Sequence, residues 1–308
     1  MKIFKKITIF SLIIAIITFC FTGCSLFGEE TDSSIAQEGT PLYYIQNDEL
    51  VKPSQNNLFR YKIYEHYVSI SEYIGEETNI TIPDKIEDLP VYVIEEFSFA
   101  DNQTISSITM SDNIVQIGMS CFSYCSLLKT VKLPEELEVI PNEMFHSCSS
   151  LEDIKFPETL KEISSDAFYG CEALTSIIIP SSVEIVDSSA FSYCSNLKKV
   201  VFMDGVIGDE EGNYVKTVYK TLGGSIFSDC PALETILVPD SVFTIDDYAF
   251  SGLSKEAFIY GYVPSSISDY CATQKINFIE VVEGDDKDRQ MKDRAIIVPE
   301  TETKPEKE

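Results

Sequence analysis

Histidine, cysteine and paired carboxylates are the residues of this chain that could act as bases, nucleophiles or metal ligands. The 308 residues include nine cysteines and two histidines, and tryptophan is absent. His66 and His146 stand in different segments, with nothing nearby to bring them together. The sequence has no Gly-x-Ser-x-Gly elbow and no phosphate-binding or dinucleotide-binding glycine loop. Acid pairs such as Glu135 and Glu136 are typical of solvated turns. We therefore predict no enzyme and no cofactor.

Phenylalanine recurs at a fixed interval through the middle of the chain. It stands at positions 99, 122, 145, 168 and 191, which are 23 residues apart, and again at 227 and 250. Two largely aliphatic columns precede the Phe, by five and by eight positions. The column at minus eight is Val91, Ile114, Leu137, Leu160, Val183, Tyr219 and Val242. Columns in register indicate a solenoid, in which each coil buries its apolar residues only against its neighbours.

Each repeat contains a short β-rich segment that ends at proline, such as 151–157, 174–180 and 233–239. Proline cannot donate to a sheet ladder, so it belongs at a strand end. The rest of a repeat, such as 181–194, has apolar residues three to five positions apart. We expect an α/β solenoid: a right-handed coil with one parallel β-sheet and short helical or 3-10 returns.

The pattern L-x-x-I-x-I-P-x-x-V-x-x-I-x-x-x-A-F-x-x-C resembles that of the BspA-like leucine-rich-repeat proteins, over roughly 58–282. Residues 59–99 are similar to the family's N-terminal segment, in which a β-hairpin covers the first coil. Residues 258–281 are similar to its closing strand, helix and strand. The resemblance implies a surface or secreted module that binds host, matrix or cell proteins, and it carries over no catalytic residues.

The first 24 residues have the features of a bacterial export signal. Three lysines precede an apolar run from Ile7 to Phe21, which is too short for a comfortable membrane span. The run leads into F-T-G-C, which resembles a lipobox whose cysteine, Cys24, is acylated and becomes the mature N-terminus. We predict an extracytoplasmic protein, lipid-anchored to the bacterial cell membrane and exposed at the cell surface. An uncleaved N-terminal anchor is the alternative.

The remaining segments follow from composition and charge. We expect a flexible tether at 25–57, an N-terminal cap at 58–98, repeats at 99–257, a C-terminal cap at 258–282 and a disordered charged tail at 283–308. The formal charge is −27, and loss of the three signal lysines would make it −30. Such a charge repels nucleic acid and favours basic partners, so we predict no nucleic-acid partner. Nothing in the pattern indicates an oligomeric state.

Seven cysteines remain after Cys20 and Cys24 are assigned to the export signal. The column three positions after each Phe contains Asn102, Cys125, Cys148, Cys171, Cys194 and Cys230, and it ends at Leu253. Zinc needs three or four converging ligands, whereas one thiol per coil forms a line, so we predict no metal site. Stacked thiols point alike, and we interpret them as a reduced, buried structural ladder. Disulfides within the ladder are the alternative.

Alternation along a strand places the eighth and tenth residues after each Phe on the outward face. The row of tenth residues begins with polar side chains and becomes apolar at Ile178, Val201, Leu237 and Tyr260. Phe258, in the row of eighth residues, extends this apolar group. A contiguous exposed apolar patch usually marks an interaction site, so these five residues are the candidate protein-binding face. Covering by the chain's own insertion or tail, or β-propensity alone, are the alternatives.

The longer interval before Phe227 holds an insertion at 204–216. It is rich in oxygen ligands but lacks the spacing of an EF-hand, so an acidic hairpin is preferred to a calcium site. Its acids and amide are Asp204, Asp209, Glu210, Glu211 and Asn213. We predict a surface lipoprotein acting as an adhesin or protein-binding scaffold. A carbohydrate-binding component of a nutrient-capture system, or a passive envelope spacer, are the alternatives.

Overall fold

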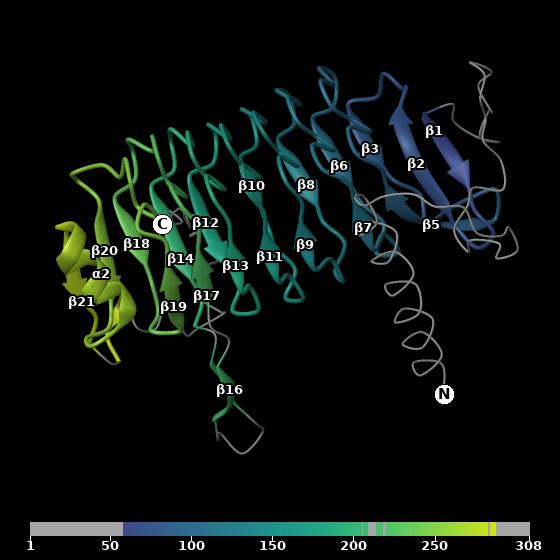
Figure 1. Cartoon of the computed structure of the whole chain (residues 1–308). Helices are drawn as coiled ribbons and strands as arrows, with labels where there is room; N and C mark the ends of the chain where they lie inside the picture. Colours follow the sequence, from purple (N-terminus) through teal and green to yellow (C-terminus); the bar gives the residue numbers. More distant parts are fainter. Residues whose placement is uncertain (1–57, 205, 209–213, 218–219, 283, 288–308) are drawn as a thin grey trace, which may run out of the picture.

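The computed structural model describes residues 58–204, 206–208, 214–217, 220–282 and 284–287. In it the chain winds into about nine turns of a parallel β-solenoid. The coils stack side by side into a rod (Figure 1). The prediction of a solenoid is therefore confirmed.

One line of strands follows the proline-terminated segments. It contains β3 (Asn79–Thr81), β6 (Ser107–Thr109), β8 (Thr130–Lys132), β10 (Asp153–Ile154), β12 (Ser176–Ile179), β14 (Lys199–Phe202), β18 (Thr235–Leu237), β20 (Phe258–Gly261) and β21 (Phe278–Glu280). These form two parallel sheets, ordered β10-β8-β6-β3 and β12-β14-β18-β20-β21. Strands pair at equivalent repeat positions, as Val200 does with Ile177 and Ile236, so side-chain columns continue between coils.

A second line of parallel strands lies where helical or 3-10 returns were expected. It contains β5 (Leu89–Ile94), β7 (Gln116–Ile117), β9 (Val139–Ile140), β11 (Glu162–Ile163), β13 (Ile185–Val186), β17 (Lys220–Leu222) and β19 (Val242–Ile245). β5 pairs with β7, and β9 to β19 form one sheet. Each coil thus contributes two strands, and the expectation of a single sheet with helical returns was wrong.

The returns are turns because of two left-handed residues in almost every coil. We call the five residues centred on each repeat Phe the Phe turn. In almost every Phe turn, both the first and the last residue have positive φ. In chain order these residues are Phe97, Asp101, Ser120, Tyr124, Glu143, Ser147, Asp166, Gly170, Ser189, Tyr193, Ser225, Asp229 and Gly252. An L-residue in this region cannot continue a right-handed helix. The turns instead bond to one another, as when the amide of Phe122 donates to the carbonyl of Met144 at 2.9 Å.

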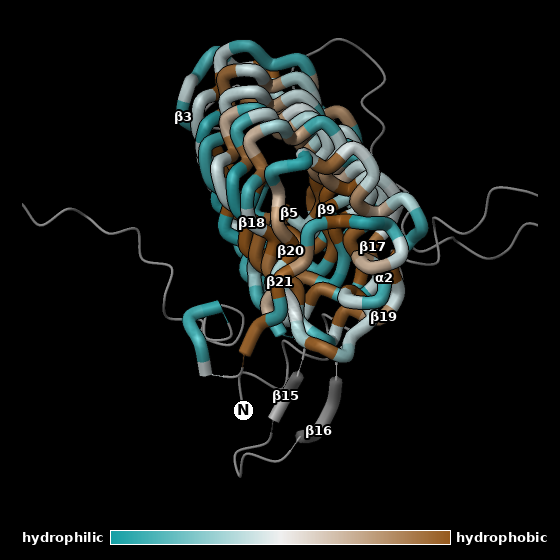
Figure 2. The backbone as a smooth tube through the Cα atoms, turned by 90° about the vertical axis from the view of Figure 1, so that its left-hand side faces the viewer, coloured by the Kyte–Doolittle hydropathy of each residue, from teal (hydrophilic) through white to brown (hydrophobic). Residues whose placement is uncertain are grey.

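The core is one continuous interior between the two lines of strands. The seven repeat phenylalanines are at most 3% exposed. They stack in sequence, from Phe99 on Phe122 at 4.8 Å to Phe227 on Phe250 at 6.1 Å between ring centroids. A view along the rod shows hydrophobic residues inside and hydrophilic ones outside (Figure 2). Offset aromatic stacking and apolar burial therefore join neighbouring coils.

Both ends of the solenoid are capped, as expected. At the N-terminal end β1 (Phe59–Ile63) pairs antiparallel with β2 (Val68–Tyr73), which lies parallel to β5. The short β4 (Lys85–Ile86) pairs with β5. At the other end α2 (Ser266–Gln274) connects β20 to β21. Tyr73 stacks on Phe99 at 5.5 Å, and Tyr270 contacts Phe250 at 5.8 Å, so an aromatic ring closes each end of the Phe column.

The insertion forms an antiparallel hairpin of β15 (Val206–Gly208) and β16 (Tyr214–Thr217). It projects from the lower edge of the rod (Figure 1). Residues 209–213, which include most of the candidate calcium ligands, lie outside the described residues. The hairpin agrees with the preferred interpretation of this segment.

Lys220 follows the insertion and is 1% exposed. A register shift pairs it with Val242, so Lys220 occupies the column that the sequence assigned to Tyr219, which lies outside the described residues. Its ammonium donates to the carbonyls of Pro180, Ser181 and Val183 at 2.7–3.1 Å. Burial lowers the pKa of Lys220 to about 8.

Candidate functional site

The predicted binding face on the first line of strands is largely covered. Val201 and Leu237 are 1% and 0% exposed, and Ile178 and Tyr260 are half-buried. Phe258 differs from these four residues, because it is 38% exposed. The expectation of an open apolar patch was therefore wrong for the residues at its centre.

The cover comes from the chain's own C-terminal segment. Val201 and Leu237 share a second hydrophobic cluster with Met203 and with Val281, which follows β21. The amide of Val281 donates to the carbonyl of Gly261 at 2.7 Å. Farther along, the Lys287 ammonium lies 4.7 Å from the centre of the Tyr260 ring. This is the intramolecular alternative weighed for the patch, and we do not propose that face as a binding site.

The cysteine column points inward and forms a ladder of thiol hydrogen bonds. Each Sγ donates to the carbonyl of the repeat Phe in the preceding coil, at 3.1–3.3 Å. The donors are Cys125, Cys148, Cys171, Cys194 and Cys230. These five thiols, like those of Cys121 and Cys271, are buried and form no disulfide bond. The geometry gives the ladder a structural role, because the thiols satisfy carbonyls inside the core.

Asn102 departs from this ladder. It is half-buried, and its Oδ1 accepts hydrogen bonds from the amides of Thr104 and Ile105 at 2.9 and 2.8 Å. No Phe turn precedes its coil, so it has no equivalent carbonyl to bond. Asn102 therefore caps a local turn, and its assignment to a buried polar ladder was wrong.

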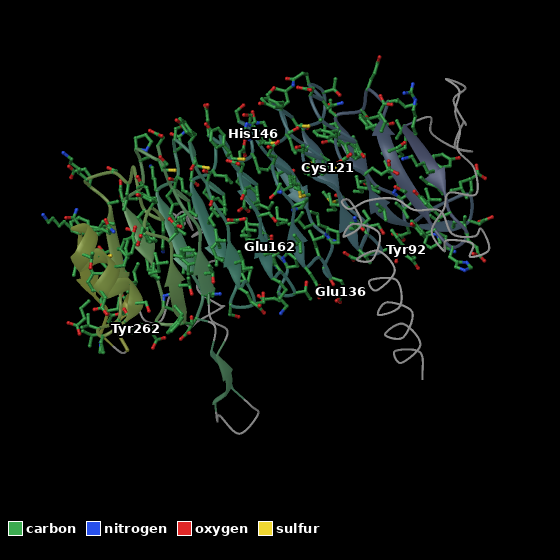
Figure 3. The ribbon with its side chains drawn as sticks, in the orientation of Figure 1. Tyr92, Cys121, Glu136, His146, Glu162 and Tyr262 are labelled. Carbon is green, nitrogen blue, oxygen red and sulfur yellow. The ribbon has the colours of Figure 1, made fainter. Side chains whose placement is uncertain are left out.

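A different set of side chains is exposed along the edge formed by the Phe turns. Tyr124, His146, Tyr169 and Tyr193 come from four successive coils, and we call them the aromatic ridge. His146 and Tyr169 stack with centroids 4.7 Å apart and planes 2° from parallel. Tyr124 contacts His146 at 5.3 Å, and Tyr169 contacts Tyr193 at 4.8 Å. Figure 3 places His146 on the upper edge of the rod, across the solenoid from Glu136.

The aromatic ridge is exposed and rigidly supported. Tyr124 and Tyr193 are 51% and 48% exposed, and His146 and Tyr169 are half-buried. The backbone amides of ridge residues bond across coils, as from Tyr124 to the carbonyl of His146 at 2.7 Å. This ladder holds the rings in register before any partner arrives, which reduces the entropy lost on binding.

Acidic side chains surround the aromatic ridge. The relevant segment of each coil runs from three residues before the repeat Phe to five residues after it. The acids in these segments are Glu96, Asp101, Glu143, Asp166, Glu172, Asp229 and Asp247. The one cationic residue there, histidine aside, is Lys255. Burial raises the pKa of Asp166, and the negative charges of Glu143 and Asp187 add to this, while His146 lowers it. The edge therefore presents aromatic rings in a negative field, which favours basic groups.

The repeat pattern does not reveal the aromatic ridge, because the four rings are divided between two repeat positions. Tyr124 and Tyr193 stand two residues after the Phe, whereas His146 and Tyr169 stand one residue after it. Neither position forms an aromatic column by itself. A search for aromatics at either position on successive repeats would have found the set.

The predicted lipid site, Cys24, and the predicted export signal lie outside the described residues. Among the residues that the structure does describe, none of the helices has the length and apolarity needed to cross a bilayer.

The comparisons with known proteins agree with this geometry. The model of the BspA type leucine rich repeat region matches six copies, over residues 68–198 and 214–283. A leucine rich repeat protein of T. pallidum is 23% identical, with 73% of this chain and 95% of that one covered and a TM-score of 0.53. A leucine-rich repeat protein from Bacteroides ovatus is also 23% identical, with a TM-score of 0.53; the match covers 67% of this chain and 54% of that one. A search of the curated proteins finds no match.

Proposed function

Because the chain belongs to the BspA-type leucine-rich-repeat family, we propose that it is a non-catalytic protein-binding scaffold that contacts its partner through the aromatic ridge. The observation that carries this proposal is the row of four exposed or half-buried rings, each in contact with the next, on one edge of a rigid solenoid. Tyrosine is enriched in protein interfaces because it adds contact area at a low cost in entropy. The acids around the ridge favour a basic partner surface.

The stacking favours a protein partner over a carbohydrate. A sugar-binding platform offers the face of an aromatic ring to the sugar. In the aromatic ridge, His146 lies between Tyr124 and Tyr169, and Tyr169 lies between His146 and Tyr193. The two inner rings therefore present their edges to solvent, and these suit the packing and hydrogen bonding of a protein surface.

We propose further that the scaffold is held on the bacterial surface by a lipid on Cys24. The basic start, the apolar run and the F-T-G-C ending of residues 1–24 support this. Substituting Cys24→Ser should abolish incorporation of a labelled fatty acid and release the chain from the membrane fraction. Retention of label and location in this variant would contradict the lipid anchor.

An attachment assay tests the binding function. Cells that display the full chain are applied to immobilised matrix and plasma proteins, and the variant Tyr124→Ala/Tyr169→Ala/Tyr193→Ala is compared with wild type. We expect loss of attachment with a similar thermal midpoint. The matched control is Phe243→Ala, at a 65% exposed residue on β19 outside the ridge, which should attach as wild type does. Equal attachment of all three chains would instead favour a passive spacer, and attachment to glycans alone would favour sugar binding.

A further inference from the structure

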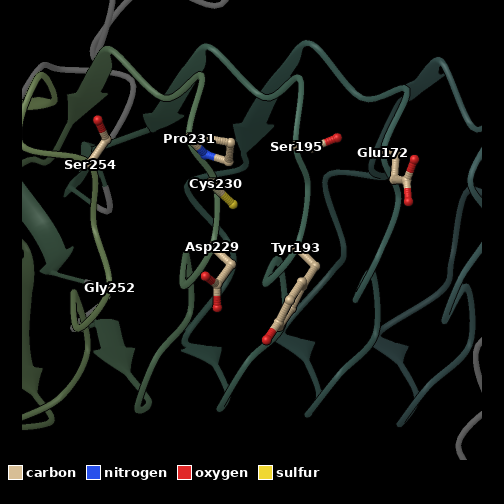
Figure 4. Close-up of a pocket in the computed structure, with 8 residues that line it drawn as sticks. All are labelled: Glu172, Tyr193, Ser195, Asp229, Cys230, Pro231, Gly252 and Ser254. Carbon is tan, nitrogen blue, oxygen red and sulfur yellow. The ribbon is translucent and has the colours of Figure 1, made fainter.

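The aromatic ridge ends at an open pocket of about 500 Å³. Its walls come from successive coils and include Glu172, Tyr193, Asp229 and Gly252 (Figure 4). The last residue of the Phe turn is Tyr193 in one coil, Asp229 in the next and Gly252 in the third. Gly252 adopts φ +77°, and a Cβ there would lie 2.6 Å from Ser228 Oγ. The third coil therefore offers no side chain at this position, which leaves the hollow beside Asp229.

Tyr193 is the terminal ring of the stack. Tyr169 packs on one side of it, at 4.8 Å and 37°. No other ring of the described residues packs against Tyr193, and its ring contributes to the pocket wall. The neighbouring Asp229 carboxylate raises the pKa of the Tyr193 phenol, through hydrogen bonding and its negative charge. In Figure 4 the two side chains extend side by side from neighbouring coils. One face of the Tyr193 ring therefore lies beside the Asp229 carboxylate.

The charge of the pocket has a single sign. Glu172 and Asp229 are both exposed, and no lysine or arginine is among the residues that line it. A cation that enters would meet a carboxylate and the negative face of an aromatic ring in one place. This combination suits a guanidinium, which is planar, stacks on aromatic rings and donates several hydrogen bonds in a fixed geometry. An ammonium would keep the charge but lose the stacking of one plane on another.

We infer that this pocket receives an arginine side chain of the partner protein, with the guanidinium stacked on Tyr193 and hydrogen-bonded to Asp229, while the charge of Glu172 adds to the attraction. This inference rests on the proposed protein-binding function and deepens it. The ridge would supply contact area, and the pocket would fix the register of the partner by accepting one residue. Specificity would then be for arginine over lysine.

The test is an NMR titration of the purified full chain with N-acetyl-arginine amide, observed at labelled tyrosine rings. We expect saturable shifts at Tyr193, with weaker effects at Tyr169 and none at Tyr92 in the N-terminal cap. The amide of N-acetyl-citrulline, which has the same shape without the charge, should produce no saturable shift. N-acetyl-lysine amide should bind about fivefold more weakly than the arginine probe.

Matched variants make the result specific. Asp229→Asn should weaken the arginine probe about fivefold, whereas Glu135→Gln, an exposed acid elsewhere on the rod, should leave it unchanged. Equal binding of the citrulline probe, or shifts that Asp229→Asn leaves intact, would overturn the inference. The attachment assay remains independent: loss of attachment in the ridge variant together with a failed titration would remove the arginine pocket and leave the protein-binding function standing.

Discussion

The imidazole of His146 lies face to face with the phenol ring of Tyr169, with ring centroids 4.7 Å apart and planes 2° from parallel. The two residues are 23 positions apart and hold the same place in successive repeats. The one-repeat spacing of the coils therefore sets the distance between the rings. The solenoid turns a repeat in sequence into a surface of regularly spaced aromatic groups.

His146 connects the two halves of the aromatic ridge, and the ridge should depend on the ring at this position. His146→Ala should weaken attachment to the partner about tenfold, because it removes the ring on which Tyr124 and Tyr169 both pack. His146→Phe keeps an aromatic ring of similar width and should restore most of the attachment. Equal attachment by the alanine and phenylalanine variants in the cell assay would show that stacking at this position has no role.

The covered patch on the first line of strands should contribute to stability. Val201→Asp or Leu237→Asp places a carboxylate at a position that is at most 1% exposed, and should lower the free energy of unfolding by about 3 kcal/mol or more. The control is Thr109→Asp, at the same repeat position on β6 but exposed, which should change it by less than about 0.5 kcal/mol. Chemical denaturation measures both. A Val201→Asp protein as stable as wild type would show that the cover is not maintained in solution.

Alkaline pH should destabilise the solenoid through its thiols. Burial raises the pKa of Cys125 from 9 to about 12. Between these values the unfolded chain releases the thiol proton while the folded chain keeps it, so stability falls as pH rises above 9. Relative to Cys125→Ala, wild type should lose about 1.4 kcal/mol of unfolding free energy per pH unit in that range. Denaturation at pH 8, 9.5 and 10.5 in the presence of a reductant measures the difference; a constant difference would contradict the buried thiol.

Lys220 should show the opposite dependence on pH. Its pKa is about 8 in the folded chain, against an ordinary value of 10.5. The cost of burying its charge is fully present below pH 8 and is relieved as pH rises to about 10.5, because only the unfolded chain is then still protonated. Wild type should therefore gain about 3 kcal/mol relative to Lys220→Met across this interval. A direct NMR titration of the Lys220 side chain should give a midpoint near 8, and a midpoint near 10.5 would contradict the buried ammonium.

The solenoid was predictable because its determinants repeat at a fixed interval. Phe122 and Phe145 recur with the same neighbours, and burial of the whole column requires coil to stack on coil. The second line of strands was not predictable in the same way. Strands of two residues, such as Val139–Ile140, are too short to show the alternation that distinguishes a strand from a helical return.

The functional surface was harder to predict, because it depends on features that do not repeat. The alternation rule placed Val201 and Leu237 on the outer side of the strands, but the segment around Val281 that covers them has no periodic signal. A register shift brings Lys220 into the core after the insertion. The aromatic ridge is divided between two repeat positions, so its surface becomes visible only when the coils are stacked.

Site-specific photo-crosslinking tests recognition through the aromatic ridge most directly. The photoreactive residue p-benzoyl-phenylalanine is placed at Tyr124 in one full chain and at Phe243 in another, and both are illuminated on cells attached to the partner identified in the attachment assay. Both positions are more than half exposed, so they are equally open to reaction. We predict crosslinks to the partner from position 124 and none from position 243. Crosslinks from position 243 with none from position 124 would contradict the proposal.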